Sequence, residues 1–392
     1  MTTDTNTAHP NTANPNTADI LIIGGGMAGA SAGYFMADDA KVILLERESQ
    51  PGYHTTGRSA ALFFENYGNA TIRKLNKITR PFLESPPEGF ADAPLMTPRG
   101  AAAVATEELL DTLAHELAQS PSMERIDGKT LFEIAPYLDP DRIVAGAYEA
   151  GAMDMDVNAI LHGFLRGLRA KGGRVVTDAE VMGLSRAEGV WTVQTRAGTF
   201  SAPIVVNAAG AWCDVVGEMA GAAKIGLIPK RRTAFTFDAT LRDGTTADPS
   251  RWAMTDLCDE SWYVRPEGGR MMGSPADEIP SPPTDAQPEI EDVALAIDRI
   301  QTDTLFVINR PHSTWAGLRS FVADKSPVVG FAPAAEGFLW VAGQGGYGIQ
   351  TSAAMGRFSA AMALGRDVPD DMAALGLTKA ELAPDRPGLG KK

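Results

Sequence analysis

The clearest pattern along the chain is an apolar run, a cluster of glycines and a second apolar run. Asp19 opens a continuous apolar stretch to Ile23, as expected of a strand buried on both faces. Glycines follow, then a helix-like stretch to about Ala37, and then a second strand at 42–45 that ends at Glu46. The pattern predicts a strand–helix–strand unit of a parallel sheet.

The middle of the chain continues this alternation. Residues 158–169 carry apolar side chains at helical spacing, and the glycine pair at 172–173 is expected to end that helix. Residues 175–176 are β-prone, and 190–195 with 199–206 frame a hairpin. The alternation of strands and helices is typical of an α/β fold.

Two other stretches have a different pattern. Residues from about 225 to 325 alternate short β-prone pieces with Pro/Gly turns and hold an amphipathic helix at 290–301. Residues from about 70 to 148 hold a second such helix at 107–119. We expect these stretches to form one antiparallel-sheet domain inserted into the first, in an α/β (α+β) fold.

Charge and composition exclude several functions. The chain of 392 residues has 35 Lys and Arg against 49 Asp and Glu, a net charge of −14. This balance argues against nucleic-acid binding and against docking on anionic lipid, because both need a basic face. Two cysteines and five scattered histidines provide no disulfide framework and no metal-ligand spacing, so we expect no metal.

The chain ends and two uncharged windows bear on whether the protein is secreted, spans a membrane or stays in the cytoplasm. Residues 1–18 are a polar Thr/Asn/Ala/Pro tract without a secretory signal, and we expect a disordered tail there and from about Pro384. The windows 20–37 and 337–356 reach membrane-spanning length, but their glycines favour tight turns. We therefore expect no membrane span and a cytoplasmic protein.

The first glycine cluster has the spacing of a dinucleotide fingerprint. Gly24-x-Gly26-x-x-Gly29 follows a strand, and Glu46 stands about 20 residues on. The glycines permit a tight turn, close approach of the backbone to a pyrophosphate and close helix–strand packing, while the helix N-terminus attracts phosphate. Glu46 can accept the adenosine-ribose hydroxyls. The alternative is a structural glycine-rich turn.

Two further segments bear on the choice between FAD and NAD. Residues 53–60 are dense in hydroxyls and small residues, and 343–351 form a glycine-rich loop that leads into a helix. Loops from both ends of the chain suit a long cofactor held at both ends. The helix N-terminus after 351 could also stabilise negative charge on a reduced flavin. The sequence therefore favours FAD.

These motifs resemble the FAD-dependent D-amino-acid dehydrogenase and oxidase superfamily, most of all its D-arginine dehydrogenase branch. The resemblance covers nearly everything from residue 19 to about 365 and rests on the segments 24–29, 45–47, 52–54, 57–61, 206–214, 229–232, 314–321 and 344–350. It implies a Rossmann-like FAD-binding domain at 19–75, 149–225 and 322–370, a substrate domain at 76–148 and 226–321, and a C-terminal tail at 371–392.

The resemblance also implies which residues surround a non-covalently bound FAD. We see no covalent flavin attachment in Cys213, and we expect a structural role for His54. The residues expected to bind FAD are Gly24, Gly26, Met27, Ala28, Gly29, Glu46, Arg47, Thr55, Thr56, Gly57, Arg58, Ser59, Ala60, Val181, Ala209, Gly210, Trp212, Gly345, Gly346, Tyr347, Gly348, Ile349, Gln350 and Thr351.

Substrate contacts follow from the same resemblance. It implies that Arg232 and Arg319 bind a substrate carboxylate, which a guanidinium can hold through two parallel, charge-assisted hydrogen bonds. Other residues that match substrate-facing positions of the family are Tyr67, Tyr263, Gly346 and Gln350. The alternatives are a solvated basic pair and ordinary half-buried tyrosines.

The pocket departs from the cationic-substrate pattern of that branch. In that branch an acidic residue follows the turn that corresponds to 97–99. In this chain the turn is followed by Gly100 and Ala101 instead. A buried cation without a partner carboxylate is strongly disfavoured, so D-arginine and D-lysine are expected to be poor substrates unless another acid, such as Glu65, compensates. Leu62, Phe64 and Ala101 suggest an apolar pocket for bulky hydrophobic substrates.

The expected activity is FAD-dependent oxidative deamination of D-amino acids to 2-oxo acids and ammonia, by hydride transfer to flavin N5. Electrons are expected to pass to a quinone or other carrier rather than to oxygen. Three alternatives stay open. They are oxidation of glycine, N-methyl amino acids or a 2-hydroxy acid on the same scaffold, a flavin-binding protein without turnover, and an NAD-dependent dehydrogenase.

Overall fold

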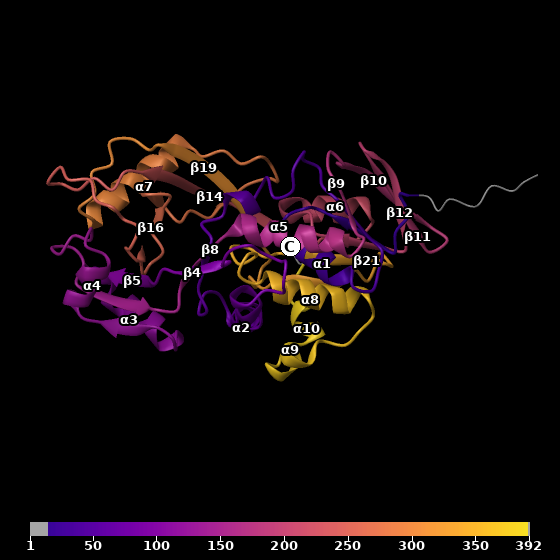
Figure 1. The fold of residues 1–392 in the computed structure, drawn as a ribbon, viewed down its shortest axis with the longest axis horizontal. Helices are drawn as coiled ribbons and strands as arrows, with labels where there is room; N and C mark the ends of the chain where they lie inside the picture. The colour runs from indigo at the N-terminus through magenta and orange to yellow at the C-terminus, as the bar shows by residue number, and fades with distance from the viewer. Residues whose placement is uncertain (1–14, 391–392) are drawn as a thin grey trace, which may run out of the picture.

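A computed structural model describes residues 15–390 of the chain (Figure 1). Its elements gather in two halves, each built around one large sheet. Most of the predicted N-terminal tail lies outside the described residues. The described end of that tail, from residue 15, runs beside the strand β12 (Gly198–Ala202), where Thr17 forms a bridge with Ser201.

A six-stranded sheet forms the core of the first half. Its strands are β1 (Ile20–Ile23), β2 (Val42–Leu45), β9 (Arg174–Val176), β13 (Ile204–Asn207), β20 (Val328–Phe331) and β21 (Phe338–Ala342). Their order is β20-β21-β13-β1-β2-β9, and all pair in parallel except β20 with β21. Side chains from α1 (Met27–Met36), α5 (Val157–Ala170) and α8 (Ser352–Ala363) join the apolar core on one face of this sheet.

The predicted strand–helix–strand unit is confirmed as β1, α1 and β2. Both uncharged windows fold as a strand, a glycine-rich turn and a helix, from β1 to α1 and from β21 to α8. In the described part of the chain, no helix combines the length and the apolar character that a bilayer span requires.

The strand predicted at 199–206 is divided between two sheets, so its prediction as one element was wrong. β12 ends at Ala202 and pairs with β11 (Val190–Thr195), which pairs with β10 (Val181–Ala187) in a small antiparallel sheet. β13 begins two residues later in the parallel sheet. Pro203 separates them, and proline has no N–H for a continuous ladder.

A nine-stranded, mostly antiparallel sheet forms the second half, as expected of the two stretches with the different pattern. Its strands are β5 (Ala101–Ala105), β6 (Glu124–Ile126), β7 (Ala145–Glu149), β14 (Ile228–Phe237), β15 (Met254–Leu257), β16 (Tyr263–Glu267), β17 (Arg270–Ser274), β18 (Ile279–Pro280) and β19 (Ser313–Phe321). The order is β18-β14-β17-β16-β15-β5-β7-β6, and β19 pairs with β14.

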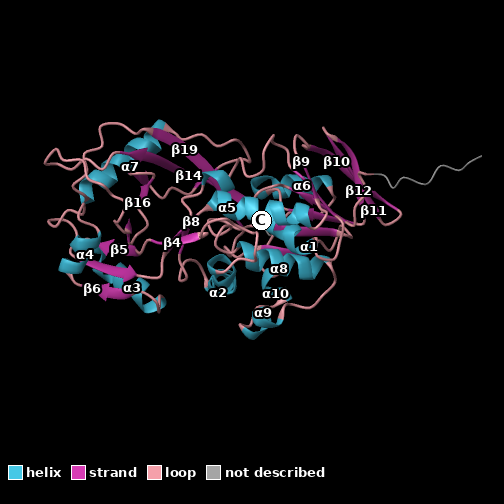
Figure 2. Ribbon diagram, viewed as in Figure 1, coloured by secondary structure: helices cyan, strands magenta, loops and turns pink. Residues whose placement is uncertain are grey.

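Helices flank the strands of this second sheet, as Figure 2 shows. They are η2 (Glu107–Leu109), α3 (Leu110–Gln119), α4 (Gly128–Ile134) and α7 (Ile290–Asp303), close to the predicted helices at 107–119 and 290–301. A three-stranded sheet of β3 (Leu62–Phe63), β8 (Met153–Met155) and β4 (Met96–Pro98) lies where the two halves meet (Figure 1).

The domain boundary expected between residues 75 and 76 falls inside α2 (Ala70–Glu84). Ile72, Leu75 and Leu83 of this helix belong to the same apolar core as α1 and α8. One amphipathic helix presents one continuous apolar face, so the whole of α2 packs with the first half.

The C-terminal segment treated as a tail packs against the first half as far as it is described. Met372 and Leu382 are buried in its core, and the Arg386 guanidinium is 2.8 Å from the Asp324 carboxylate. The prediction of disorder from Pro384 was therefore wrong, because a few spaced apolar side chains and one buried arginine are enough to anchor the segment. The remaining short helices are η1 (Thr56–Arg58), η3 (Gly210–Trp212), α6 (Cys213–Met219), α9 (Asp370–Ala374) and α10 (Lys379–Leu382).

Candidate functional site

Two cavities meet between the halves of the molecule. The first, here called the strand-end cavity, lies where β1, β2 and β13 end, and it extends to the loop that precedes α8. In parallel sheets ligands bind at this carboxyl edge of the strands. The second, here called the sheet cavity, has a volume of about 750 Å³ and is lined by strands of the nine-stranded sheet together with α3 and residues 59–69.

The glycine turn after β1 can be made only by glycines. Gly24 has a φ of +108°, and a Cβ there would lie 2.3 Å from the Ala208 carbonyl oxygen. A Cβ on Gly29 would lie 1.9 Å from the Gly24 carbonyl oxygen. The Thr56 hydroxyl accepts a 3.0 Å hydrogen bond from the Met27 N–H, which brings η1 over the start of α1. This geometry is a cradle for a pyrophosphate at a helix N-terminus.

Glu46, expected to bind ribose hydroxyls, also holds the glycine turn in place. Its carboxylate accepts hydrogen bonds from the N–H groups of Gly25 at 2.7 Å and Glu48 at 2.9 Å. Burial raises the pKa of Glu46, and these two bonds oppose that shift. The side chain still lines the strand-end cavity, and each carboxylate oxygen has a second lone pair for a hydroxyl donor.

Most residues expected to bind the cofactor line the strand-end cavity. They are Gly24, Gly26, Met27, Ala28, Glu46, Arg47, Thr55, Thr56, Arg58, Ser59, Ala60, Val181, Ala209, Gly210, Trp212, Gly345, Gly346, Gly348 and Ile349. Gly29, Gly57 and Thr351 do not line it. Gly57 closes η1 by donating to the Gly52 carbonyl, and the Thr351 hydroxyl donates to the Tyr347 carbonyl. Tyr347 and Gln350 line the sheet cavity instead.

Two polar groups of the strand-end cavity lack a partner within the described chain. The Ser320 hydroxyl and the Gln344 amide nitrogen are buried without a hydrogen bond, and both residues line this cavity. Buried polar groups without partners are costly, so they indicate a ligand that supplies hydrogen bonds. Sequence reasoning did not list either residue, although both lie within segments that it singled out, Ser320 in 314–321 and Gln344 in 343–351.

His54 and Trp212 form one wall of the same cavity. Their rings lie 4.8 Å apart, and the Arg47 guanidinium lies 4.9 Å from the Trp212 ring. His54 Nε2 lies 2.8 Å from the Glu48 carboxylate, which ties the loop after β2 to this wall. Cys213 is fully buried and does not line the cavity, and burial raises the pKa of its thiol.

The two arginines expected to bind a carboxylate stand where the cavities meet. Arg232 on β14 and Arg319 on β19 line both cavities, together with Tyr263 and Gly346. The strand alternation places the neighbouring Arg231 elsewhere, in ion pairs with Glu289 and Asp292, at 2.8 and 2.7 Å. A Cβ on Gly346 would lie 3.1 Å from the Arg319 guanidinium, so glycine allows this close approach.

Positive charge is in excess at this junction. The Arg232 guanidinium donates to the Asp277 carbonyl at 2.7 Å and lies 3.7 Å from Glu278, while Arg319 forms no ion pair with a carboxylate of the described residues. Burial alone would raise the pKa of Tyr263, but the Arg319 and Arg232 guanidiniums outweigh it and hold the pKa below its ordinary value. The junction is therefore suited to an anion.

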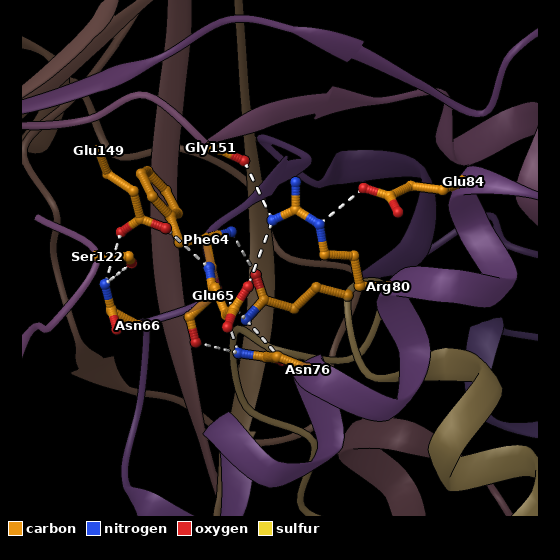
Figure 3. Close-up of polar contacts among 10 residues, drawn as sticks. Phe64, Glu65, Asn66, Asn76, Arg80, Glu84, Ser122, Glu149 and Gly151 are labelled. Carbon is orange, nitrogen blue, oxygen red and sulfur yellow. Dashed lines mark hydrogen bonds and ion pairs between the residues drawn. The ribbon is translucent and has the colours of Figure 1, made fainter.

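The loop at 64–67, which carries Phe64 and Tyr67 into the sheet cavity, is held from two sides (Figure 3). On one side, Asn76 of α2 donates to the Phe64 carbonyl at 3.2 Å and accepts from Gln350 at 3.0 Å. On the other, Glu149 of β7 accepts from the Glu65 N–H at 3.0 Å. Gln350 thus anchors this loop as well as lining the cavity.

The sheet cavity is not the purely apolar pocket that the sequence predicts. Leu62, Phe64 and Ala101 do line it, with Tyr67, Met254 and Trp262, but Glu116, Glu149, Asp256 and Glu260 line it too. Glu65, considered as a compensating acid, is outside the lining and lies 3.4 Å from Arg80 (Figure 3). The sequence feature that could have indicated a charged group in this cavity is Asp256, a carboxylate inside the short β-prone run 254–257.

The profile of the DAO family, described as FAD dependent oxidoreductase, matches residues 19–362. The chain belongs to this family. Its cofactor is FAD, and the glycine cradle and the unpartnered polar groups of the strand-end cavity fit such a ligand. This match establishes the DAO family, and it does not establish the D-arginine dehydrogenase branch that the sequence resembles.

One curated relative and two solved structures are similar to this chain over most of its own length. Dimethylglycine dehydrogenase, mitochondrial, of Homo sapiens is 24% identical over 403 residues, which cover 95% of this chain and 44% of that protein. The chain thus spans less than half the length of this relative. The structure resembles those of L-proline dehydrogenase from P. horikoshii (TM-score 0.78, 20% identity, 95% of this chain and 98% of that one) and glycine oxidase from Geobacillus kaustophilus (TM-score 0.77, 20% identity, 93% and 99%).

Proposed function

We propose that this chain catalyses the FAD-dependent oxidative deamination of D-amino acids to 2-oxo acids and ammonia. The observation that carries the proposal is the position of Arg232 and Arg319 on the wall shared by the strand-end cavity and the sheet cavity. A carboxylate held there has the cofactor site on one side and space for a side chain on the other.

The chain itself contributes binding and orientation. Two guanidiniums bind the carboxylate and thereby fix the position of the α-carbon. In an enzyme of this kind, holding the reacting carbon in place contributes most of the rate enhancement. FAD, when bound, supplies the chemistry by accepting two electrons and a proton from the α-carbon. The oxidised product is an imino acid, which water hydrolyses to the 2-oxo acid and ammonia.

No carboxylate or histidine is found among the described residues that line both cavities, which are Ser59, Ala60, Arg232, Tyr263, Arg319, Gly346 and Ile349. We therefore expect the ammonium group of the substrate to lose its proton to water rather than to a side-chain base. Leu62, Phe64, Ala101 and Met254 support an apolar section of the substrate next to its α-carbon.

An anaerobic titration of the FAD-loaded protein tests this function. The expected result is bleaching of the oxidised flavin by D-amino acids and not by their L-enantiomers. Bleaching only by L-amino acids or by a 2-hydroxy acid would contradict the proposal, and an unbleached flavin with every compound would favour a binding protein without turnover.

Oxidation of glycine or N-methyl amino acids is the second candidate. The named activities of dimethylglycine dehydrogenase and glycine oxidase favour it, and the same paired guanidiniums would bind these carboxylates. Such small substrates would leave most of a 750 Å³ cavity unfilled, which supports the larger substrate. Sarcosine, dimethylglycine and glycine belong in the same titration.

We further propose that electrons leave to a quinone or other carrier rather than to oxygen. The substrate-reduced protein is mixed with air-saturated buffer in one experiment and with a soluble quinone under nitrogen in another. Reoxidation at least about tenfold faster with the quinone is expected, and the reverse order would identify an oxidase.

A further inference from the structure

The strand that carries Arg232 has a gap along one of its edges. On that edge β14 pairs with β18 at residues 230–231 and with β17 at residues 235–237. Among the described residues, no strand pairs with 232–234 on this edge, although β19 pairs with them on the other. The chain leaves the sheet here, as the loop 275–278 between β17 and β18. The anion site therefore lies at an interruption of the sheet.

The loop 275–278 closes this gap through one residue, Asp277. Its carboxylate accepts hydrogen bonds from the Thr233 N–H at 2.6 Å and from the Thr233 hydroxyl at 3.0 Å. Its main-chain carbonyl accepts a hydrogen bond from Arg232 Nε at 2.7 Å. Thr233 is fully buried, so its N–H needs a partner, and the carboxylate takes the place of the missing strand. Asp277 thus binds the backbone of one residue and the side chain of its neighbour.

The bond to Nε decides how Arg232 can meet a ligand. A guanidinium binds a carboxylate through two parallel N–H groups, and Nε can be one of them. Because the Asp277 carbonyl occupies Nε, only the two terminal nitrogens are left for such a pair of bonds. The side chain is therefore restricted to one mode of carboxylate binding, end-on at the junction of the two cavities.

Glu278 offers Arg232 a competing position. Its carboxylate lies 3.7 Å from a terminal nitrogen of Arg232, beyond hydrogen-bond distance, and 2.7 Å from the Lys230 ammonium. Glu278 and Arg232 both line the sheet cavity. A guanidinium that was free to turn would close the remaining distance to Glu278, since a direct charge-assisted bond is stronger than a separated ion pair. The contact with Asp277 opposes that turn.

Asp277 itself lines neither cavity, whereas its neighbours Ala276 and Glu278 line the sheet cavity. Ala276 has a φ of +52°, a left-handed conformation that is uncommon for a residue with a side chain, and its N–H donates to the Ser274 hydroxyl at 3.1 Å. Strained backbone of this kind persists where the surrounding contacts fix it, often beside a functional site. The position of Asp277 indicates an effect on ligands that passes through Arg232.

We propose that Asp277 is a positioning residue of the anion site, which holds the Arg232 guanidinium toward the substrate carboxylate and away from Glu278. This inference rests on the proposed function, in which that carboxylate binds at the arginine junction. The carboxylate of Asp277 fixes the loop on Thr233, and the carbonyl of the same residue then fixes Arg232. The interruption of the sheet at 232–234 makes room for both contacts.

A double-mutant cycle between Asp277 and Arg232 tests this role. In the otherwise unchanged, FAD-loaded protein, Asp277→Ala is expected to lower kcat/KM for D-leucine about tenfold, mainly through a higher KM, because the carboxylate is bound less well. In an Arg232→Ala background the same substitution should change kcat/KM by less than about twofold, since no guanidinium remains to be positioned. A tenfold loss in both backgrounds, or no loss in either, would overturn the inference.

Two further variants separate positioning from a general effect on folding. Asp277→Asn keeps an oxygen for the Thr233 N–H and an amide that can donate to the Thr233 hydroxyl, so kcat/KM should stay within about threefold. Asp292→Ala is the matched control, because Asp292 holds the neighbouring Arg231 at 2.7 Å and lines neither cavity. We expect it to change kcat/KM by less than about twofold. Either variant losing as much as Asp277→Ala would contradict the positioning role.

Flavin absorbance per chain checks that each variant is folded and loaded. If Asp277→Ala does not retain FAD, Asp277→Ser takes its place in the cycle, because its hydroxyl keeps a polar group in the loop but is too short to bridge to both Thr233 groups. The same tenfold loss, confined to the background that retains Arg232, is expected. Equal losses in both backgrounds would again overturn the inference.

Failure of this inference differs from failure of the proposed function. If D-leucine reduces the flavin and the cycle shows no coupling, D-amino-acid oxidation stands and only the role of Asp277 is wrong. If D-leucine does not reduce the flavin of the unchanged protein, the proposed function is contradicted. A crystal structure of the Asp277 variant then decides the inference, since the Arg232 guanidinium should turn toward Glu278, and an unmoved guanidinium would overturn it.

Discussion

The two cavities that meet at Arg232 and Arg319 are built in opposite ways. The strand-end cavity is lined mainly by short continuous segments of the chain, around 23–28, 45–60, 179–181, 208–219, 317–320 and 344–349. The sheet cavity is made of single side chains from strands and helices far apart in the sequence. The first is a local property of the chain, whereas the second exists only after the sheet has formed.

This difference predicts how each cavity responds to substitution. Changes in the strand-end cavity should act on cofactor content, because an added Cβ at Gly24 or Gly29 would meet backbone atoms of the glycine turn. Changes in the sheet cavity should act on substrate choice and leave the cofactor bound, because most of its side chains do not line the strand-end cavity.

The largest effect is expected from Gly29→Ala. Its Cβ would lie 1.9 Å from the Gly24 carbonyl oxygen, so the turn must open and the phosphate cradle is lost. We expect purified protein without bound FAD, measured by flavin absorbance per chain. Gly183→Ala is the control, since the nearest atom to its Cβ is 3.7 Å away. A Gly29→Ala protein with full FAD content would break the comparison.

The next largest effect is expected from Arg232→Ala combined with Arg319→Ala. Loss of both guanidiniums should lower kcat/KM by about 1,000-fold, or about 4 kcal/mol, while FAD stays bound. Arg231→Ala is the matched control, because this neighbour is paired with Glu289 and Asp292 and lines neither cavity. Loss of FAD together with activity in the double variant would show that the junction is not a separate substrate site.

A smaller effect is expected from Asn76→Ala. The loop at 64–67 loses the amide that bonds Phe64 and Gln350, so its orientation is less well fixed. We expect kcat/KM to fall about tenfold and the free energy of unfolding by about 2 kcal/mol. Thr79→Val is the control, as it removes a buried hydrogen bond of the same helix, to the Ala354 N–H, without touching the loop. Equal losses of activity in both variants would assign Asn76 a purely structural role.

The smallest effect is a pH dependence of carboxylate binding. The pKa of Tyr263 is held below its ordinary value by Arg319 and Arg232, so the phenol loses its proton as the pH rises through that lowered pKa. The phenolate then competes with the substrate carboxylate for the same guanidiniums. KM should therefore rise about threefold on the alkaline side, and Tyr263→Phe should remove that rise. An identical alkaline limb in both proteins would contradict this account.

Sequence patterns predicted the cofactor half well because its information is local. The glycine spacing at 24–29, the strand before it and Glu46 can be read within 30 residues, and all take the expected places. The break at Pro203 depends on pairing with two different sheets, and the anchoring of Arg386 depends on the distant loop at 324–327. Sequence analysis did not single out Asp256, because only the pairing of β15 with β16 and β5 places it in the cavity with Tyr263 and Ala101.

The central claim is that one anion site joins the two cavities. A crystal structure of the FAD-loaded protein with the α-methyl analogue of D-leucine tests it most directly, because this compound has no α-hydrogen to transfer and remains intact. The account predicts its carboxylate in hydrogen-bond contact with both Arg232 and Arg319, and its side chain beside Leu62 and Met254 in the sheet cavity. A carboxylate bound away from both arginines, in a crystal with FAD in the strand-end cavity, would contradict the account.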